Sequence, residues 1–248
     1  MNERMWQSYI QTFHEHSPGI TERVLVPAMA GGGNQYQWIA EAVETSPRVL
    51  DLAGGSSPIA FGTGDMHVTA DLSINELALA HTRGRTCVRA SANALPFADS
   101  SFDAVVCSMA LMLLQPLDTA LKEIRRVLRL DGLFVATRPV TRPLTGRDRR
   151  RYVQLLLALR TIRLQSPNHK ALKKPGFLLA ASGFNIEDLS SVRFEYSMST
   201  DENAALMVDS LYVPTASLAR RHAASRLAQR WVPDSVGIPI QRMVARKS

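Results

Sequence analysis

The chain has 248 residues, which suits one substantial α/β domain and is too short for two full enzyme domains. Hydrophobic residues make up 46% and charged residues 21%, a composition typical of a globular protein and not of a disordered one. No stretch approaches the roughly 20 apolar residues of a membrane span, and no basic start with an apolar run opens the sequence. We therefore expect a cytoplasmic protein without a membrane partner.

Cysteines and charge narrow the function classes further. Cys87 and Cys107 are the two cysteines, and their spacing supports neither a disulfide framework nor a zinc site, so we expect no metal. The net charge of +7 is uneven: residues 1–137 hold 10 Lys and Arg against 14 Asp and Glu, and residues 138–248 hold 19 against 8. The basic half indicates a solvated surface, with a face for nucleic acid or an anionic substrate as the alternative.

The first predicted elements are two helices, over residues 2–16 and 34–44, separated by the glycines of Met29–Asn34. Aromatic residues cluster in this N-terminal segment. A lid over a ligand would need such surface, and ordinary helix packing explains it equally well. The aromatic residues concerned are Trp6, Tyr9, Phe13, Tyr36 and Trp38.

From about residue 47 to 140, apolar runs of strand length alternate with helical patterns, which indicates βαβ units and a parallel sheet. The helical pattern before the last of these strands has Pro116 in front of it and Gly132 beyond it. The predicted strands are 48–52, 67–71, 86–90, 102–107 and 132–137, and that helix is 117–128.

The remaining sequence predicts a helix over 147–164 and a strand over 192–198, where apolar and polar residues alternate. Residues 201–231 indicate two helices broken at Pro214, and 238–246 indicate a closing strand. The chain is therefore expected to continue the α/β pattern to its end.

A turn rich in small residues follows the first predicted strand, in the sequence Asp51-Leu52-Ala53-Gly54-Gly55-Ser56-Ser57. Open α/β sheets bind ligands at the carboxyl ends of their strands, and small residues let the backbone approach a ligand closely. By itself the turn is equally compatible with a tight connection that binds nothing.

Asp71 ends the second predicted strand, 20 residues after Asp51, at the spacing where a carboxylate accepts hydrogen bonds from ribose hydroxyls. A dinucleotide site would require glycine at the positions of Ala53, Gly55 and Pro58, and two of these three lack it. The pattern therefore favours a nucleoside ligand without phosphates.

Three segments together resemble the class I S-adenosylmethionine-dependent methyltransferases, over roughly Arg48 to Thr137. They are the turn Val49–Ser56 with Asp71-Leu72-Ser73 after it, the segment Ala92–Val105, and the helix and turn Leu121–Gly132. The resemblance implies a Rossmann-like, doubly wound α/β fold with a mostly parallel seven-stranded sheet. It also implies a helical lid over 1–46, a cofactor-binding domain over 47–248, and within that domain a helical insertion over 199–236 before the last strand.

The same resemblance implies S-adenosylmethionine as cofactor and assigns its contacts. Asp51 and the backbone around Gly55 would hold the methionine part, Asp71 the ribose, and Leu72 would pack on the adenine. The family usually has glycine where Ala53 and Ser57 stand, and an acid where Ser91 stands. The full set of expected cofactor contacts is Asp51, Ala53, Gly54, Gly55, Asp71, Leu72, Ser91, Ala92, Cys107, Ser108 and Met109.

Methyl transfer from a sulfonium is an in-line displacement, so the protein mainly has to position the acceptor and exclude water. An acceptor hydroxyl would gain from a proton acceptor, and His14 and His16 on the first predicted helix are the candidates, although surface histidines are commoner. Substrate contacts are expected from Tyr9, Tyr36, Met112 and Tyr212.

The expected reaction is methylation of a small organic metabolite, in small-molecule or secondary metabolism. Three alternatives remain open at this stage. They are transfer of the 3-amino-3-carboxypropyl group from the same cofactor, methylation of RNA, and a non-catalytic nucleotide-binding partner protein. The oligomeric state is not indicated by the sequence.

Overall fold

The computed structural model describes residues 3–62, 66–164 and 166–248. Within these residues one sheet of seven strands runs through the molecule in the order β3-β2-β1-β4-β5-β7-β6. Strands β1 to β5 are parallel, and β7 is antiparallel to both β5 and β6, which confirms the mostly parallel α/β sheet. The strands are β1 Arg48–Leu52, β2 Met66–Asp71, β3 Thr86–Arg89, β4 Phe102–Ser108, β5 Leu128–Pro139, β6 Phe184–Ser197 and β7 Ser235–Lys247.

The central position of β1 follows from its burial. Both β1 and β4 are buried on the two faces of the sheet, and parallel strands in that position are near-continuous apolar runs. β1 lies between β2 and β4, so the strand order reverses direction there. Ligands bind beyond the carboxyl ends of the strands at such a reversal point, which places a site after Leu52.

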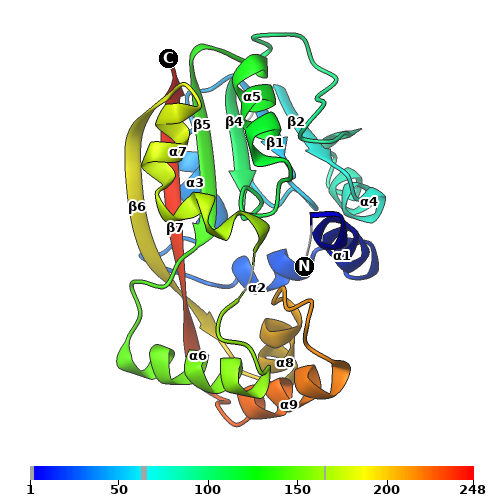
Figure 1. Cartoon of the computed structure of the whole chain (residues 1–248), viewed down its shortest axis with the longest axis vertical. Helices are drawn as coiled ribbons and strands as arrows, with labels where there is room; N and C mark the ends of the chain where they lie inside the picture. Colours follow the sequence, from blue (N-terminus) through cyan, green and yellow to red (C-terminus); the bar gives the residue numbers. More distant parts are fainter. Residues whose placement is uncertain (1–2, 63–65, 165) are drawn as a thin grey trace.

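Helices cover both faces of the sheet (Figure 1). Val49 and Val106 pack with α2 and α3 on one face, while Leu50 and Phe134 pack with α5 and α7 on the other. Alternate residues of one strand thus belong to two separate apolar clusters, one on each face of the sheet. The helices concerned are α2 Ile20–Leu25, α3 Gln35–Glu41, α5 Leu117–Val127 and α7 Pro175–Ala181.

Three helices gather at one end of the molecule, beside the ends of β6 and β7 (Figure 1). They are α6 Gly146–Ala158, α8 Asp201–Asp209 and α9 Leu218–Gln229. We call these three helices the cap. The expected pair of helices before the last strand is therefore present, and α6 joins them by packing on α9.

The N-terminal helix α1, Glu3–His16, packs against α4, Ile74–Thr82. The short helix α2 contacts α8 of the cap, so the N-terminal segment lies between the sheet and the cap. None of the helices in the described residues is long and apolar enough to cross a membrane.

Several element boundaries differ from the sequence predictions. The helix expected over 147–164 ends at Ala158, because Arg160 adopts a left-handed backbone with φ 51° that stops the helical hydrogen bonds. β6 begins at Phe184, well before residue 192, since its polar first half pairs with β7 at the edge of the sheet. Helices α2 and α7 and the 3₁₀ turns Pro167–His169 and Ala171–Lys173 were not predicted, because segments this short show no periodicity.

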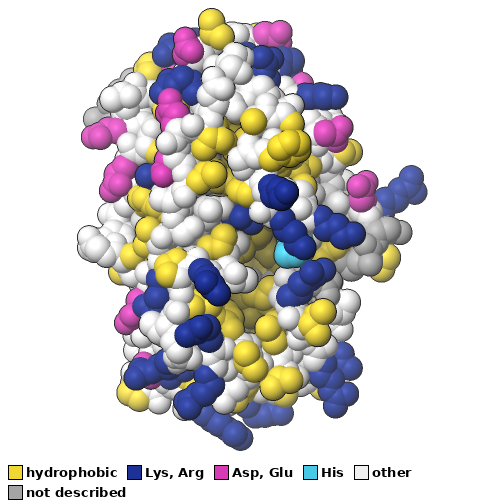
Figure 2. Space-filling model, turned by 60° about the vertical axis from the view of Figure 1, so that its left-hand side comes forward, with side chains coloured by type: hydrophobic (Ala, Val, Ile, Leu, Met, Phe, Trp, Pro, Cys, Tyr) yellow, Lys and Arg dark blue, Asp and Glu magenta, His cyan; other side chains and the backbone are white. Residues whose placement is uncertain are grey.

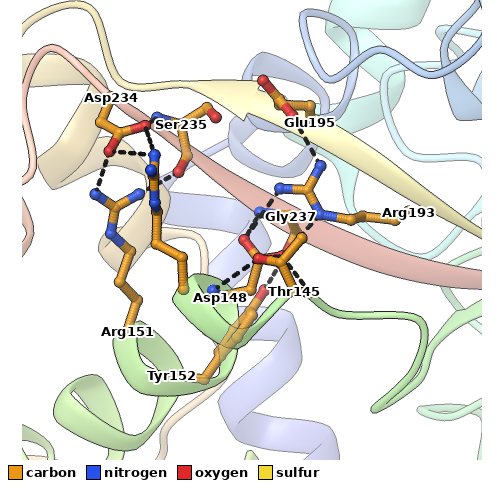
Figure 3. Close-up of polar contacts among 10 residues, drawn as sticks. Thr145, Asp148, Arg151, Tyr152, Arg193, Glu195, Asp234, Ser235 and Gly237 are labelled. Atoms are coloured by element: carbon orange, nitrogen blue, oxygen red, sulfur yellow. Dashed lines mark hydrogen bonds and ion pairs between the residues drawn. The ribbon is translucent and has the colours of Figure 1, made fainter.

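The cap is joined to the sheet by a buried carboxylate, Asp148, near the start of α6 (Figure 3). Its oxygens accept hydrogen bonds from the Thr145 backbone N–H at 2.9 Å, the Gly237 N–H at 2.8 Å and the Arg193 Nε at 2.7 Å. A β-carbon at position 237 would collide with the Arg193 side chain, so this strand position requires glycine. We refer to these four residues as the Asp148 cluster.

Burial raises the pKa of Asp148, but the hydrogen bonds from Arg193, Thr145 and Gly237 outweigh it and hold the pKa well below its usual range. A native pKa below that of the unfolded chain means that the carboxylate stabilises the fold above pH about 4, and that this stabilisation is lost as the pH falls further. A second ion pair joins α6 to the segment before β7: Arg151 pairs with Asp234 and also lies over the Trp231 ring (Figure 3 shows the ion pair).

The Asp148→Asn variant tests this attachment. It should lower the free energy of unfolding at pH 7 by about 2–3 kcal/mol, because Arg193 loses its buried counter-charge. Urea unfolding measures this, and the difference from the wild-type protein should shrink as the pH is lowered below about 4. Asp188→Asn is the matched control: Asp188 is partly exposed and lies 3.3 Å from Arg242, so the change should stay within about 0.5 kcal/mol. Equal effects of the two variants would contradict the role of Asp148.

Candidate functional site

A cavity of about 390 Å³ opens beyond the carboxyl ends of β1, β2 and β4, where the strand order reverses. This volume is within the usual range for small-ligand sites. Its walls come from helices α1 to α4, from the turn after β1, from the ends of β2 and β4, from the segment after β3, and from a residue of the segment between α8 and α9. Among the expected site residues, it is lined by His14, Tyr36, Ala53, Gly54, Gly55, Asp71, Leu72, Ser91, Ala92, Ser108, Met109 and Tyr212.

The turn after β1 takes a strained path that explains its composition. Ala53, Gly55 and Ser57 all have left-handed backbones, with φ of 51°, 56° and 51°. Ala53 and Ser57 therefore stand at positions where glycine is preferred, each at a cost of roughly 1 kcal/mol. A β-carbon at Gly54 would lie 2.5 Å from the Asp51 carboxylate, so no other residue fits there.

Asp71 connects the ends of the first two strands. Its Oδ2 accepts the Gly55 N–H at 2.9 Å and its Oδ1 accepts the Ser73 N–H at 2.8 Å. Burial raises the pKa of Asp71, and these two amide bonds partly offset that effect. Because an ionised carboxylate has about four acceptor positions, two remain for donors from a ligand.

Asp51 lies beneath Gly54 and is not among the cavity-lining residues. Its Oδ2 accepts a hydrogen bond from Ser57 Oγ at 3.0 Å, and Ser57 in turn accepts one from Thr69 at 2.9 Å. Its buried Oδ1 has no partner within the described parts of the chain. Burial raises the pKa of Asp51 to about 7, so the carboxyl is close to its titration point at neutral pH.

The cavity walls carry carboxylates and no Lys or Arg among the described residues. Glu22, Asp71 and Glu76 are the acids, and His14 is the one titratable base. Glu22 and Glu76 were missed by the sequence analysis. The Ser73-x-x-Glu76 spacing identifies a helix N-cap, and Ser73 Oγ does accept the Glu76 N–H at 3.3 Å. The Glu76 carboxylate does not bond back to Ser73, because Asp71 already accepts the Ser73 N–H.

His14 connects three distant segments at the cavity wall. Its Nδ1 lies 2.7 Å from Glu76 Oε1, and its Nε2 lies 3.0 Å from the hydroxyl of Tyr212. The other oxygen of Glu76 accepts the Gly19 N–H at 3.0 Å. His16 lies outside the cavity, with its Nδ1 2.8 Å from the carbonyl oxygen of Thr12. The structure thus places one of the two candidate histidines at the site.

The end of β4 is held by a buried amide. Gln35 Nε2 donates to Ser108 Oγ at 3.0 Å, and Gln35 Oε1 accepts from Thr137 Oγ1 at 3.0 Å. Gln35 is fully buried and was missed, because a glutamine at the start of a helix has no distinctive spacing. Met109, next to Ser108, has φ 56°, which turns the chain sharply into the cavity wall.

Besides His16, four expected site residues lie behind or beside the cavity. Asp51 is buried as described, and Cys107 is fully buried, which raises the pKa of its thiol to about 12. Met112 is also buried, in the apolar cluster around α5. The Tyr9 hydroxyl points to the cap, where it accepts hydrogen bonds from Arg221 and from the Val213 N–H.

Residues 50–136 match the family model of a methyltransferase domain. Demethylmenaquinone methyltransferase of Mycolicibacterium vanbaalenii is 39% identical over 100 residues, which cover 38% of this chain and 44% of that protein. A malonyl-acyl-carrier-protein O-methyltransferase of Geobacter sulfurreducens is 38% identical over 105 residues, covering 38% and 39%. The chain thus spans less than half the length of the curated relatives it matches.

Solved structures share the fold over most of the chain. YcgJ of Bacillus subtilis has a TM-score of 0.56 and 18% identity, covering 86% of this chain and 97% of that one. An S-adenosylmethionine-dependent methyltransferase of Thermotoga maritima has a TM-score of 0.54 and 14% identity, covering 96% and 100%. The cyclase SpnF has a TM-score of 0.54 and 23% identity, covering 86% and 80%. At these identities the comparison establishes the fold.

The Asp51→Asn variant tests the raised pKa. A native pKa above that of the unfolded chain makes the wild-type protein lose stability as the pH rises from about 4 to about 7. The variant has no carboxyl that titrates at this position. Its free energy of unfolding, minus that of the wild-type protein, should therefore rise by about 2 kcal/mol between pH 5 and pH 8. Unfolding curves at both pH values measure it. Asp118→Asn, at an exposed position, should show no such change, and a flat difference for Asp51→Asn would show that Asp51 is ionised throughout.

Proposed function

We propose that this chain, whose residues 50–136 match the model of a methyltransferase domain, binds S-adenosylmethionine and methylates a small neutral organic acceptor. The observation that carries the proposal is the charge of the cavity. Three carboxylates and no Lys or Arg line it among the described residues. Glu22 is paired with Arg83 behind the wall and Glu76 with His14, which leaves Asp71 as the carboxylate without a basic partner. Such a site favours a cation over phosphates.

S-adenosylmethionine fits this set of groups. It has a nucleoside without phosphates, an ammonium group and a sulfonium, whereas a dinucleotide would bring a pyrophosphate against Asp71 and Glu76. Asp71 has acceptor positions left for ribose hydroxyls, and the unpartnered Oδ1 of Asp51 lies directly beneath the turn. Ser91, where an acid is usual in the family, offers the adenine a hydroxyl that already accepts the Asn93 N–H at 3.2 Å.

When bound, the cofactor supplies an electrophilic methyl group. The protein's own part is to orient the acceptor, to exclude water and, for a hydroxyl acceptor, to take up a proton. Glu76 accepts from Nδ1 of His14, which leaves Nε2 as the proton acceptor, here facing Tyr212. An acceptor hydroxyl that takes the place of the Tyr212 hydroxyl would meet this nitrogen.

The remaining residues that line the cavity support an acceptor that is neutral. Beyond the carboxylates, the cavity is bounded by uncharged side chains, namely Gln7, Ile10, Leu113, Leu114, Gln115, Tyr36 and Tyr212. Most of these lie outside residues 50–136, so the acceptors named for the relatives do not transfer directly. The quinone named for one relative is nevertheless of the same neutral, apolar kind. An anionic metabolite, allowed by the composition alone, is disfavoured by the carboxylates.

Calorimetry with S-adenosylmethionine tests the cofactor assignment. The Asp71→Ala variant should bind it at least tenfold more weakly, because each hydrogen bond to a charged group contributes about 1.5–3 kcal/mol. Asp118→Ala on the exposed face of α5 is the control and should bind normally. Absence of wild-type binding at millimolar cofactor, or tighter binding of a nicotinamide dinucleotide, would contradict the proposal.

Acceptor chemistry is tested by release of S-adenosylhomocysteine with panels of neutral phenols and quinols, and by the product's mass gain. A gain of one methylene unit supports methyl transfer, and a gain of an aminocarboxypropyl group contradicts it. With a hydroxyl acceptor, His14→Gln should lower kcat by roughly 100-fold or more while cofactor affinity is kept. His16→Gln is the matched control on the same helix. Equal kcat for both variants would remove His14 as the proton acceptor.

A further inference from the structure

The cap helix α6 presents an unusual stripe to solvent. At 100° per residue, Arg149, Val153 and Leu157 fall within about 100° of one another around the helix axis, together with Arg150, and the exposed Arg160 follows the end of the helix. Val153 is 55% exposed and Leu157 is 71% exposed, while the opposite side of the helix, including Leu155, is buried. The stripe therefore mixes arginines with aliphatic side chains that nothing in the described chain covers.

The chain after α6 continues this composition. Ile162 is 91% exposed and Phe177 is 76% exposed, and Lys170, Lys173 and Lys174 lie between them in sequence. Figure 2 shows this side of the molecule, with Lys and Arg side chains over its lower half and hydrophobic side chains between them, around a hollow. We call the α6 stripe and residues 160–164 and 166–177 together the basic-aliphatic face.

The charge of this segment is strongly one-sided. Residues 138–174 contain eleven Lys and Arg and a single acid, Asp148, which is buried against Arg193. Two of the eleven, Arg147 and Arg151, pair with Asp234 outside the segment. Arg149, Arg150 and Arg160 form no ion pair within the described residues. Arg138, Arg163 and Lys173 all lie close enough to His169 to lower its pKa, after the effect of burial. The exposed and unpaired Arg149, Arg150 and Arg160 are therefore available to an external anion.

We infer that the basic-aliphatic face docks on an anionic lipid surface. Basic groups are attracted to anionic headgroups, and exposed aliphatic side chains enter the apolar boundary beneath them. RNA would use the same cations and could stack on Phe177, but Ile162, Leu157 and Val153 offer it neither stacking nor polar contacts, whereas all four apolar side chains can enter a lipid boundary. The expectation of no membrane partner came from the lack of a spanning segment, and surface docking does not need one.

Docking on this face would bring the cavity wall close to the lipid. Asn168, in the 3₁₀ turn of the face, donates from Nδ2 to the carbonyl oxygens of Leu111 and Leu114 at 2.9 and 2.6 Å. Its N–H also donates to the Met112 carbonyl oxygen at 3.2 Å. Leu114 lines the cavity. The lipid-facing turn and the apolar wall of the candidate site are thus hydrogen-bonded to each other.

Co-sedimentation of the full chain with vesicles tests the inference without any acceptor. The protein should bind vesicles of phosphatidylcholine mixed with phosphatidylglycerol and not vesicles of phosphatidylcholine alone, and added salt should weaken the binding. Transfer RNA is the competing probe. Failure of cofactor binding would leave this measurement unaffected, so the two proposals can fail separately.

Two variants separate the aliphatic and the cationic contributions. Leu157→Asn should weaken binding to the mixed vesicles about tenfold, because it removes apolar burial without changing the charge. Arg149→Gln/Arg160→Gln should weaken it by about tenfold or more. The controls are Leu130→Asn, which alters a 67% exposed leucine at the far end of β5, and Arg4→Gln/Lys122→Gln, which removes two exposed cations elsewhere. Both should bind like the wild-type protein.

Three results would overturn the inference. The first is no binding to the mixed vesicles at low salt. The second is binding that Leu157→Asn leaves unchanged, which would show that no side chain enters the lipid. The third is binding of transfer RNA that the arginine variant abolishes, with no vesicle binding, which would assign the face to nucleic acid.

Discussion

The carboxylate of Asp71 sets the geometry on which the rest of the site depends. It accepts the N–H groups of Gly55 and Ser73, so the turns after β1 and β2 are held at one fixed separation. By taking the Ser73 N–H, it also frees the Glu76 carboxylate from the usual capping contact. Glu76 then reaches Gly19 and His14, which fixes the N-terminal segment against the cavity.

Local strain in the turn is compensated by specific contacts. Ser57 occupies a left-handed position that favours glycine, yet its hydroxyl is the hydrogen-bond donor to the buried Asp51. A glycine there would remove the strain and leave both buried oxygens of Asp51 without a donor. The departure from the family's pattern at this position therefore has a physical reason. Ala53 has the same strained backbone, and its methyl group packs on the apolar cluster around α5.

The cavity wall that contains Tyr212 depends on the cap. Tyr212 belongs to the segment between α8 and α9, and α9 packs on α6, which the Asp148 cluster attaches to β6 and β7. Loss of the charge on Asp148 would therefore act on the cavity through the position of Tyr212. Part of the basic-aliphatic face, the α6 stripe, also lies on α6. One side of this helix therefore packs on α9, and its other side is exposed to solvent.

The sequence by itself determined the parallel core and the position of Asp71 at the end of the second strand, because strands, turns and the 20-residue spacing are read from local pattern. The left-handed positions at Ala53 and Ser57 were also visible as departures from glycine. Only the tertiary structure decided which acids surround the cavity and which histidine faces it. His14 meets Glu76 across 62 residues and Tyr212 across 198, and no local periodicity encodes such contacts. The burial of Asp51 behind Gly54 likewise results from tertiary packing. The sequence could therefore identify Asp51 but could not indicate that its pKa is raised.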